Sequence, residues 1–491
     1  MKKSKYKEQV KALRAELIQL QIALKDADFP VLIVISGDDR SGRHETLNLL
    51  HEWMDSRFLQ ANAYGLPTEE EQQKPFMWRY WKDLPQNGVI GLCLRDWTSY
   101  SIIEYLIDQI DEKQFTKRIE YSNAFEATLT ARGMLIIKIW LHLPEEELKH
   151  RLKIERKYLH KVWQIHQKDQ LIYSDFDRAK TVIQKTLKDT DSDSSSWHII
   201  ESSDLYQRNL HVGKLIAEKI RARLNRSATD NVQPNEDSKT GRQHETTSQK
   251  NHLDTIDLSK HLDKKTYKHE LKYWQHKASH LIYQFQEMDK SCVIVFEGWD
   301  AAGKGGCIRR LTSSIDAGFY RVIPVAAPTD EESAHHYLWR FWRKIPRAGR
   351  MSIFDRSWYG RVLVERVEGF ASDNEWQSAY DEINDFERQL HDKGIPVIKF
   401  WLHIDKEEQL ERFKERETIP YKHHKITEED YRNREKWTDY EITINDMIDK
   451  TSTSYAPWRL IPSNSKHYAR IEVLKHVCNV LEKTLKDSST E

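Results

Sequence analysis

The run IVFEGWDAAGKGG, residues 294–306, restricts the fold of this chain more than any other feature. Gly298 and Gly303 enclose four residues ahead of Lys304, which is the G-x-x-x-x-G-K spacing of a phosphate-binding loop. In such loops backbone N–H groups surround phosphate oxygens, and the lysine adds a positive charge. The apolar run before the loop and the spaced apolar residues after it predict the strand, loop and helix that this motif requires.

Gly305 follows the lysine, so the loop lacks the serine or threonine that usually helps to bind magnesium. We therefore expect carboxylates to hold Mg²⁺, with Mn²⁺ as a substitute, and Asp300 inside the loop is the first candidate. The expected phosphate ligands are the small residues of the loop, namely Gly298, Ala301, Ala302, Gly303, Gly305 and Gly306. The alternative is an ordinary glycine turn between a strand and a helix, and the flanking pattern favours the phosphate loop.

The chain also repeats itself with a constant offset. Adding 261 takes SGDDRSG at Ser36 to EGWDAAG at Glu297, WRYW at Trp78 to WRFW at Trp339, and KIWLH at Lys138 to KFWLH at Lys399. This period is far longer than that of a solenoid repeat and predicts two tandem copies of one domain. Residues 226–255 are polar and almost free of aliphatic side chains, as is typical of a solvated linker. We expect domains at 1–225 and 257–491, joined by a flexible linker at 226–256.

Apolar runs predict strands at 292–296, 322–326, 351–354, 397–402 and 458–461, and helical spacing predicts helices at 267–288, 373–393, 406–417 and 427–450. Continuous apolar runs are typical of parallel strands buried on both faces. The pattern predicts an α/β fold of two tandem P-loop kinase-like domains. Each would be a doubly wound parallel sheet flanked by helices, with a helical lid and with ligands at the carboxyl ends of the strands.

Composition narrows the classes of partner. Lysine plus arginine and aspartate plus glutamate both number 77, so net charge gives no attraction to polyanions, which local clusters must bind instead. No run approaches the roughly 18 apolar residues that span a bilayer. The four cysteines lack metal-ligand spacing, as expected of reduced thiols. We expect a cytoplasmic protein that binds neither nucleic acid nor membranes.

A second chemical element, FDRSWYGRVLVE, starts at residue 354. Asp355 lies where P-loop enzymes keep the acidic residue that orients magnesium, so it is the second predicted metal ligand. Arg356 and Arg361 can bind phosphate bidentately, and Tyr359 and Glu365 are candidates to contact the nucleotide. The alternatives are a strand-terminal cap for Asp355 and a solvated helix face for the arginines. The nearby P-loop favours catalysis.

A third element is the segment 412–436, which carries many basic residues on both sides of Pro420. In P-loop kinases a mobile basic lid supplies charge to the transferring phosphoryl group and excludes water. The candidates to bind a polyanion are Arg416, Lys422, Lys425 and Arg432, in a segment that also holds Arg412, Lys414, Arg434 and Lys436. Acidic residues are interspersed, so an ordinary charged surface helix is an equal alternative.

Several motifs of the second copy together resemble the second family of polyphosphate kinases. They are GWDAAGKGG at Gly298, WRFWRKIP at Trp339, DRSWYGRVLVERVEGF at Asp355, KFWLHID at Lys399 and TSTSYAPW at Thr451. The tandem arrangement is similar to the branch that moves the terminal phosphoryl group of inorganic polyphosphate to AMP and releases ADP. The resemblance implies that Asp300 and Asp355 position magnesium and the phosphates, while Lys304 and the lid bases hold the chain.

Other functions stay open at this point. A nucleotide kinase of thymidylate-kinase type shares the fold, loop and lid but takes its phosphoryl group from ATP. Within the polyphosphate kinases, ADP or GDP is an alternative acceptor. A non-catalytic scaffold would bind nucleotide without turnover, and the intact Lys304 and Asp355 argue against it.

The first copy keeps the scaffold and loses the chemistry. Arg43 occupies the position of Lys304, and Leu94 occupies the position of Asp355. Since leucine cannot bind a metal ion, we predict that the domain at 1–225 is catalytically inactive. Aromatic positions that survive in both copies, such as Trp78, are best explained by folding. We also expect the protein to form a homo-oligomer, namely a dimer, through surfaces inherited from an ancestral oligomer.

Overall fold

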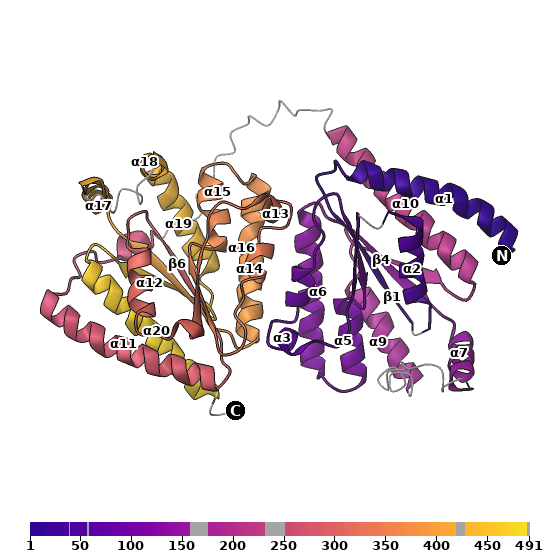
Figure 1. Ribbon diagram of the computed structural model, residues 1–491, viewed down its shortest axis with the longest axis horizontal. Helices are drawn as coiled ribbons and strands as arrows, with labels where there is room; N and C mark the ends of the chain where they lie inside the picture. Colours follow the sequence, from indigo (N-terminus) through magenta and orange to yellow (C-terminus); the bar gives the residue numbers. More distant parts are fainter. Residues whose placement is uncertain (39, 56–57, 158–174, 231–250, 419–427, 489–491) are drawn as a thin grey trace. The chain divides into compact units, whose positions relative to one another are not determined.

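The computed structural model describes the whole chain except residues 39, 56–57, 158–174, 231–250, 419–427 and 489–491. The chain divides into two compact units, and each holds one five-stranded sheet (Figure 1). Unit 1 comprises Met1–Thr68, Phe76–Arg242 and Asp330–Trp339, and unit 2 comprises Glu69–Pro75, Gln243–Thr329 and Arg340–Glu491.

The two sheets have the same topology, with all paired strands parallel. The first has the order β2-β3-β1-β4-β5, and the second, read from the corresponding edge, has β7-β8-β6-β9-β10. The strands are β1 Val31–Gly37, β2 Leu59–Ala63, β3 Ile90–Leu94, β4 Leu135–His142, β5 Trp197–Glu201, β6 Cys292–Gly298, β7 Tyr320–Pro324, β8 Met351–Asp355, β9 Val397–His403 and β10 Trp458–Pro462. The predicted α/β fold is confirmed, and the strand predicted at 322–326 begins two residues earlier.

Helices flank both sheets. The first half contains α1 Lys3–Leu24, α2 Arg43–Trp53, α3 Glu69–Gln72, α4 Trp78–Lys82, α5 Trp97–Leu106, α6 Glu112–Ala131, α7 Glu145–Lys157, α9 Phe176–Asp189 and α10 Leu205–Asp230. The second contains η3 Leu253–Thr255, α11 Lys264–Glu287, α12 Lys304–Thr312, η4 Ala317–Phe319, α13 Asp330–Ser333, α14 Trp339–Trp342, η5 Trp358–Val362, α15 Val364–Val367, α16 Asp373–Asp392, α17 Lys406–Thr418, α18 Glu428–Glu435, α19 Trp437–Thr451 and α20 Lys466–Ser488. In unit 2, α11, α12 and α20 cover one face of the sheet, and α16 covers the other (Figure 1).

Burial explains why these segments form strands. The inner strands β1 and β9 are buried along their whole length, and β6 is buried except at its last residue, because helices cover both faces of each sheet. Local signals fix the helix ends: a capping box between Ser372 and Glu375 starts α16. The single helix predicted at 427–450 is instead two helices, because the backbone leaves helical geometry at Lys436, where ψ is 25°.

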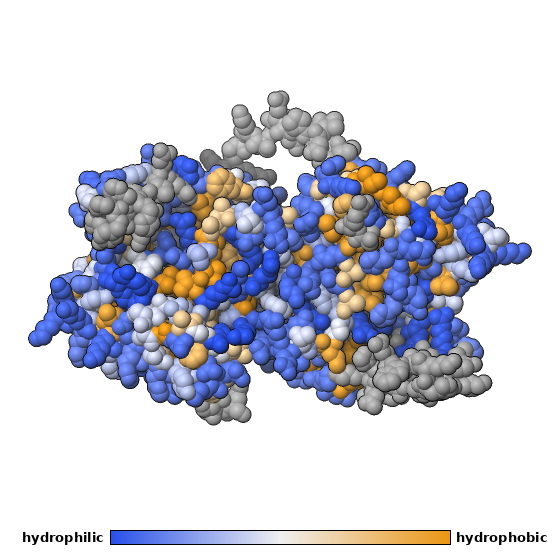
Figure 2. Space-filling view, in the orientation of Figure 1, coloured by the Kyte–Doolittle hydropathy of each residue, from blue (hydrophilic) through white to orange (hydrophobic). Residues whose placement is uncertain are grey.

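No helix in the described part of the chain is long and apolar enough to cross a membrane. Hydrophilic residues cover most of the visible surface, and apolar residues appear there only in limited patches (Figure 2).

Candidate active site

The phosphate loop connects β6 to α12, and its shape requires small residues. Gly298 has φ of 147°, and a Cβ there would lie 2.5 Å from the carbonyl oxygen of Leu402 on β9. Ala301 and Gly303 have φ of 63° and 109°, so the chain passes through left-handed backbone before α12 begins. The backbone N–H groups at the start of α12 are therefore grouped at one end of the sheet, as an anion site needs.

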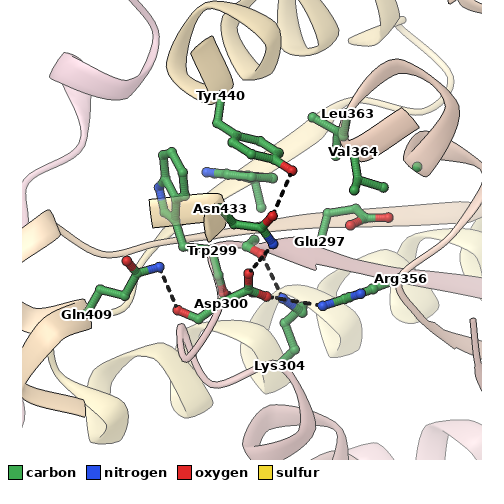
Figure 3. Close-up of a pocket in the computed structure, with 13 residues that line it drawn as sticks. Glu297, Trp299, Asp300, Lys304, Arg356, Leu363, Val364, Gln409, Asn433 and Tyr440 are labelled. Carbon is green, nitrogen blue, oxygen red and sulfur yellow. Dashed lines mark hydrogen bonds and ion pairs between the residues drawn. The ribbon is translucent and has the colours of Figure 1, made fainter. Parts of the chain in front are cut away.

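Lys304 is the first residue of α12, and its side chain curls back over the loop. Its Nζ donates to the carbonyl oxygen of Gly298 at 2.7 Å and to that of Trp299 at 3.3 Å (Figure 3). The ammonium group thus lies against the loop that would surround a phosphate. This is the position in which a lysine adds charge to phosphate binding.

Asp300 lies at the centre of the polar contacts in the pocket (Figure 3). Its Oδ1 accepts a hydrogen bond from Arg356 Nη2 at 3.2 Å, and its Oδ2 accepts one from Asn433 Nδ2 at 3.0 Å. Burial alone would raise the pKa of the Asp300 carboxyl, but the charges of Lys304 and Arg356 and these two hydrogen bonds hold it below its ordinary value. Asp300 is therefore a carboxylate at neutral pH.

Asp355 and Arg356 follow β8 at the neighbouring strand end. Asp355 Oδ2 lies 3.9 Å from the point where a Cβ on Gly305 would stand, so the carboxylate faces the first turn of α12. Arg356 has φ of 65°, which is rare for a residue with a side chain. The structure thus brings Lys304, Asp300 and Arg356 together and places Asp355 beside the start of the same helix.

The two carboxylates fit a magnesium ion. In the described ranges, no three histidine, cysteine, aspartate or glutamate side chains lie close enough to hold a metal without other ligands. Mg²⁺ in phosphoryl-transfer enzymes is typically bound by one or two carboxylates together with substrate phosphates and water. Asp300 and Asp355 supply such a pair next to the phosphate loop.

Arg361 and Glu365 pair with each other rather than with the loop. Arg361 Nε lies 3.1 Å from Glu365 Oε2, and its Nη1 lies 3.7 Å from Glu375 Oε1. The arginine is mostly buried, with 14% of its side chain exposed. Its predicted contact with phosphate, and that of Glu365 with nucleotide, stay predictions.

Tyr359 does not lie where the sequence predicted, at the nucleotide. Its side chain is fully buried and cannot contact a nucleotide in this structure. Its hydroxyl donates to Glu387 Oε1 at 2.7 Å and accepts from Lys399 Nζ at 2.8 Å. Lys399 Nζ also donates to Glu387 Oε2 at 2.8 Å. The tyrosine therefore completes a buried ion pair between α16 and β9.

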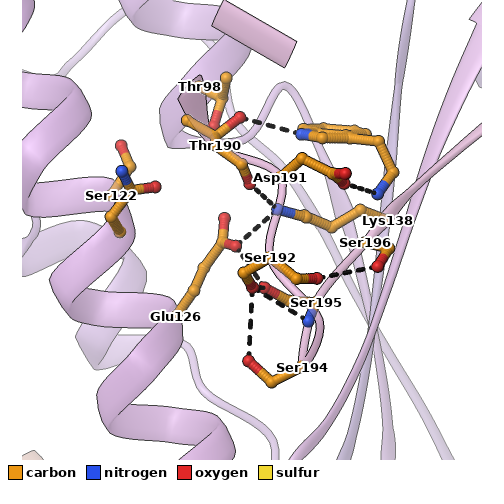
Figure 4. Close-up of polar contacts among 12 residues, drawn as sticks. Thr98, Ser122, Glu126, Lys138, Thr190, Asp191, Ser192, Ser194, Ser195 and Ser196 are labelled. Atoms are coloured by element: carbon orange, nitrogen blue, oxygen red, sulfur yellow. Dashed lines mark hydrogen bonds and ion pairs between the residues drawn. The ribbon is translucent and has the colours of Figure 1, made fainter. Parts of the chain in front are cut away.

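The first copy contains the same buried pair without the tyrosine (Figure 4). Lys138 Nζ donates to Glu126 Oε2 at 2.6 Å, and Thr98 occupies the position of Tyr359. Ser195 Oγ donates to Glu126 Oε2 at 2.8 Å and so gives this carboxylate a hydroxyl donor, although at the other oxygen than the phenol uses in the second copy. Since this pair persists in a copy that lacks Lys304 and Asp355, its role is to hold helix and sheet together.

Arg412 lies in the segment predicted to be a basic lid, but it contacts the phosphate loop from a buried position. It is 4% exposed, and its Nη1 donates to the carbonyl oxygens of Ala301 and Ala302 at 2.9 and 3.0 Å. Arg151, its counterpart, likewise donates to the carbonyl oxygen of Arg40 at 2.8 Å. Both arginines support the loop through its backbone carbonyl oxygens, and Arg412 does so from a buried position, so the inclusion of Arg412 in the lid was wrong.

The other lid candidates divide into two groups. Lys422 and Lys425 lie outside the described residues. Arg416 lies half-buried on α17, and Arg432 on α18 forms an ion pair with Glu368 at 3.5 Å. Lys436 pairs with the same Glu368 oxygen at 3.1 Å. Polyphosphate binding by these cations stays a prediction.

Sequence reasoning missed several residues of the pocket. Its lining includes Glu297, Trp299, Leu363, Val364, Trp401, Gln409, Asn433 and Tyr440, besides Asp300, Lys304 and Arg356 (Figure 3). Asn433 and Gln409 reach Asp300 through its carboxylate and its backbone carbonyl oxygen. The signal that could have found Glu297 is the repeat, because the first copy has Ser36 at that position.

The first copy keeps the loop backbone but not its chemistry. Gly42 has φ of 92°, Arg95 has φ of 59°, and α2 begins at Arg43, as at the equivalent positions of the second copy. Leu94 is 1% exposed, so an apolar side chain replaces the strand-end carboxylate. The shared backbone geometry thus belongs to the fold, whereas the carboxylate at the end of β8, Asp355, is found only in the second copy.

Comparison with known proteins identifies the family. The model of the polyphosphate kinase 2 family matches residues 1–228 and 261–489. The chain is 42% identical over 485 residues to a Pseudomonas aeruginosa protein named polyphosphate:AMP phosphotransferase, covering 99% of this chain and 97% of that protein. A protein of the same name from Acinetobacter johnsonii is 35% identical over 480 residues, 96% of each chain.

A solved structure shows the same fold. A crystal structure assigned to polyphosphate kinase 2 of Pseudomonas aeruginosa PA01 superimposes with a TM-score of 0.87 at 41% identity, covering 99% of this chain and 97% of that chain. Kinases of this family are phosphotransferases that generally need a divalent metal. The family match over both copies and the P-loop geometry agree: the chain belongs to the polyphosphate kinase 2 family of phosphotransferases.

Proposed function

We propose that the protein transfers the terminal phosphoryl group of inorganic polyphosphate to AMP and releases ADP. The observation that carries the proposal is the convergence of Lys304, Asp300 and Arg356 on one pocket at the phosphate loop. The acceptor is proposed from the relatives, since proteins named polyphosphate:AMP phosphotransferase match both copies of this chain.

The proposed roles follow from position. The N–H groups at the start of α12 and Lys304 bind phosphate oxygens, and Arg356 adds charge where the transferring group passes. Asp300 and Asp355 hold Mg²⁺, which when bound neutralises charge on the phosphates. AMP's phosphate is largely ionised near neutral pH, so the acceptor needs no general base. Arg416, Lys422, Lys425 and Arg432 are proposed to bind the polyphosphate chain.

The proposed division of labour places all chemistry in the second copy. Leu94 and Arg43 support an inactive first copy, because neither can replace the residues found at Asp355 and Lys304. The domain boundaries at 225 and 257, a homodimer and a cytoplasmic location belong to the same proposal. Light scattering after size-exclusion chromatography tests the dimer.

The deciding experiment supplies the purified protein with AMP, Mg²⁺ and long-chain polyphosphate in the absence of ATP. ADP formation at a rate proportional to enzyme supports the proposal. A protein that makes ADP only when ATP is the donor is instead a nucleoside monophosphate kinase. Parallel reactions with ADP and GDP in place of AMP test the acceptor, and a preference for either one would contradict the AMP assignment.

A further inference from the structure

Glu297 is a buried carboxylate that faces the active-site pocket, and the proposed roles above do not use it. It is the penultimate residue of β6 and lines the pocket together with Lys304, Leu363 and Val364 (Figure 3). Only 5% of the residue is exposed. A charged group buried to this extent costs stability unless hydrogen bonds or an opposite charge offset its loss of hydration.

One oxygen of Glu297 is occupied and the other is not. Oε1 accepts a hydrogen bond from Ser357 Oγ at 2.8 Å. Oε2 accepts none from the residues that the structure describes. Burial raises the pKa of the Glu297 carboxyl, and the charges of Lys304 and Arg356 oppose that shift. In its ionised form, which Lys304 and Arg356 favour, the carboxylate offers the pocket an acceptor oxygen for a donor from a ligand.

The first copy shows that the fold does not need a carboxylate at this position. There Ser36 replaces Glu297 and Asp96 replaces Ser357, so the hydroxyl and the carboxylate have exchanged places. The hydrogen bond persists: Ser36 Oγ donates to Asp96 Oδ1 at 2.6 Å. Asp96 is fully buried and caps α5 by accepting from the N–H groups of Thr98 and Ser99. Only the copy with the catalytic residues presents its carboxylate to the pocket.

The chemistry of the two substrates decides what this oxygen can bind. The internal phosphates of polyphosphate are anions without hydrogen-bond donors, so a buried carboxylate repels them. A nucleoside carries hydroxyl groups on its ribose and, in adenine, an amino group, and each can donate to a carboxylate. The apolar side chains of Leu363 and Val364 form a wall of the same pocket and suit the body of a nucleoside.

We propose that Glu297 determines which substrate enters this pocket: its Oε2 accepts a hydrogen bond from an N–H or O–H group of the acceptor nucleoside and excludes the polyphosphate chain. The inference rests on the proposed function, because it assumes one substrate with a nucleoside and one without. It assigns the nucleoside to the side of the phosphate loop lined by Leu363 and Val364 and leaves the polyphosphate chain to the remaining surface of the loop.

The test transplants the arrangement of the first copy into the second. The double variant Glu297→Ser with Ser357→Asp keeps a buried hydroxyl–carboxylate pair that the first copy shows to be compatible with the fold. Its unfolding midpoint should match that of the wild type. AMP binding, measured by calorimetry in EDTA, should weaken about tenfold or more, as expected for the loss of a hydrogen bond to a charged group. Tripolyphosphate binding should not weaken.

Analogues identify the donor. The wild type should bind AMP more tightly than whichever of 2′-deoxy-AMP, 3′-deoxy-AMP and inosine monophosphate lacks the bonded group, and the double variant should lose that preference. Equal binding of all four nucleotides by the wild type would overturn the proposal. So would a double variant that binds AMP as tightly as the wild type, or one that loses AMP and tripolyphosphate affinity equally.

Two further outcomes distinguish nucleoside binding by Glu297 from metal binding by Glu297 and from a failure of the proposed function. If Glu297 instead binds metal, the double variant keeps its AMP affinity in EDTA and needs more Mg²⁺ for turnover, which contradicts the proposal. If the wild type binds AMP but does not use polyphosphate, the proposed function fails. The binding measurements then still decide whether Glu297 contacts the nucleoside, because they require no turnover.

Discussion

Arg412 offers a direct test of how the phosphate loop is held in place. Its guanidinium donates to the backbone carbonyl oxygens of Ala301, Ala302, Ser463 and Asn464 at 2.6–3.0 Å, and its Nε donates to Glu408 at 2.6 Å. Arg412→Lys keeps the charge but has only three donor hydrogens for these five acceptors. The substitution therefore leaves at least two acceptors without a donor.

The expected cost follows from those two lost bonds. A hydrogen bond involving a charged group contributes about 1.5 kcal/mol or more, so Arg412→Lys should lower the free energy of unfolding by about 3 kcal/mol. Urea denaturation followed by circular dichroism measures this. Turnover should fall by about a hundredfold, because a shift of about 1 Å in a positioning element can cost that much.

Arg151→Lys is the matched control. Arg151 donates to the carbonyl oxygens of Arg40, Ser202 and Ser203 and to Glu147, so its replacement should also destabilise the protein. Turnover at a temperature where the protein is folded should nevertheless stay near the wild-type value, since this loop belongs to the copy that we propose to be inactive. Full activity in Arg412→Lys, or a matching loss of turnover in Arg151→Lys, would refute the reasoning.

Three more outcomes test the site and its surroundings. Lys304→Ala and Asp355→Asn should each lower turnover by several orders of magnitude in a folded protein, because each removes charge used in the transition state. Arg43→Ala should leave steady-state turnover almost unchanged. Near-normal rates in Lys304→Ala or Asp355→Asn would contradict the site. Arg432→Ala should raise the KM for polyphosphate and not the KM for AMP, and unchanged values of both would contradict the lid. Burial lowers the pKa of His403 from 6.5 to about 4. Between these pH values the unfolded state therefore binds more protons than the folded state. His403 thus contributes stability that is present above pH 6.5 and is lost as the pH falls towards 4. His403→Asn, which does not titrate, should flatten the loss of unfolding free energy between pH 6.5 and 4 by up to about 3 kcal/mol, and an unchanged pH profile in denaturant titrations would show that this histidine does not carry the effect.

Much of the fold could be predicted because its strands are buried on both faces. The run Cys292–Phe296 in β6 is apolar without interruption, and that pattern is strong in any sequence. The break between α18 and α19 could not be predicted, because no glycine or proline marks it. Lys436 leaves helical geometry there, and its Nζ lies 3.1 Å from Glu368, which is distant in sequence.

The site residues that could be predicted are those whose roles depend on local sequence. Motif spacing placed Lys304 and Asp300 at the phosphate loop, because the glycines and the lysine of such a loop lie within a few residues of one another. Tyr359 and Arg412 were misassigned because their roles depend on partners far along the chain. The hydroxyl of Tyr359 contacts Glu387, and the guanidinium of Arg412 contacts Ser463. The local sequence shows which residue stands at such a position, but it does not show which distant residue its side chain contacts.

Glu297 shows why comparing the two copies one position at a time is insufficient. Taken alone, Ser36 looks like the loss of a carboxylate, and Asp96 looks like an unrelated gain at another strand end. In space the two changes are one exchange, because each copy joins a hydroxyl to a carboxylate by a buried hydrogen bond of 2.6 or 2.8 Å. Both copies contain the pair, but with the hydroxyl and the carboxylate exchanged. In the second copy the carboxylate borders the pocket, and the proposed contact of Glu297 with the nucleoside would account for this direction.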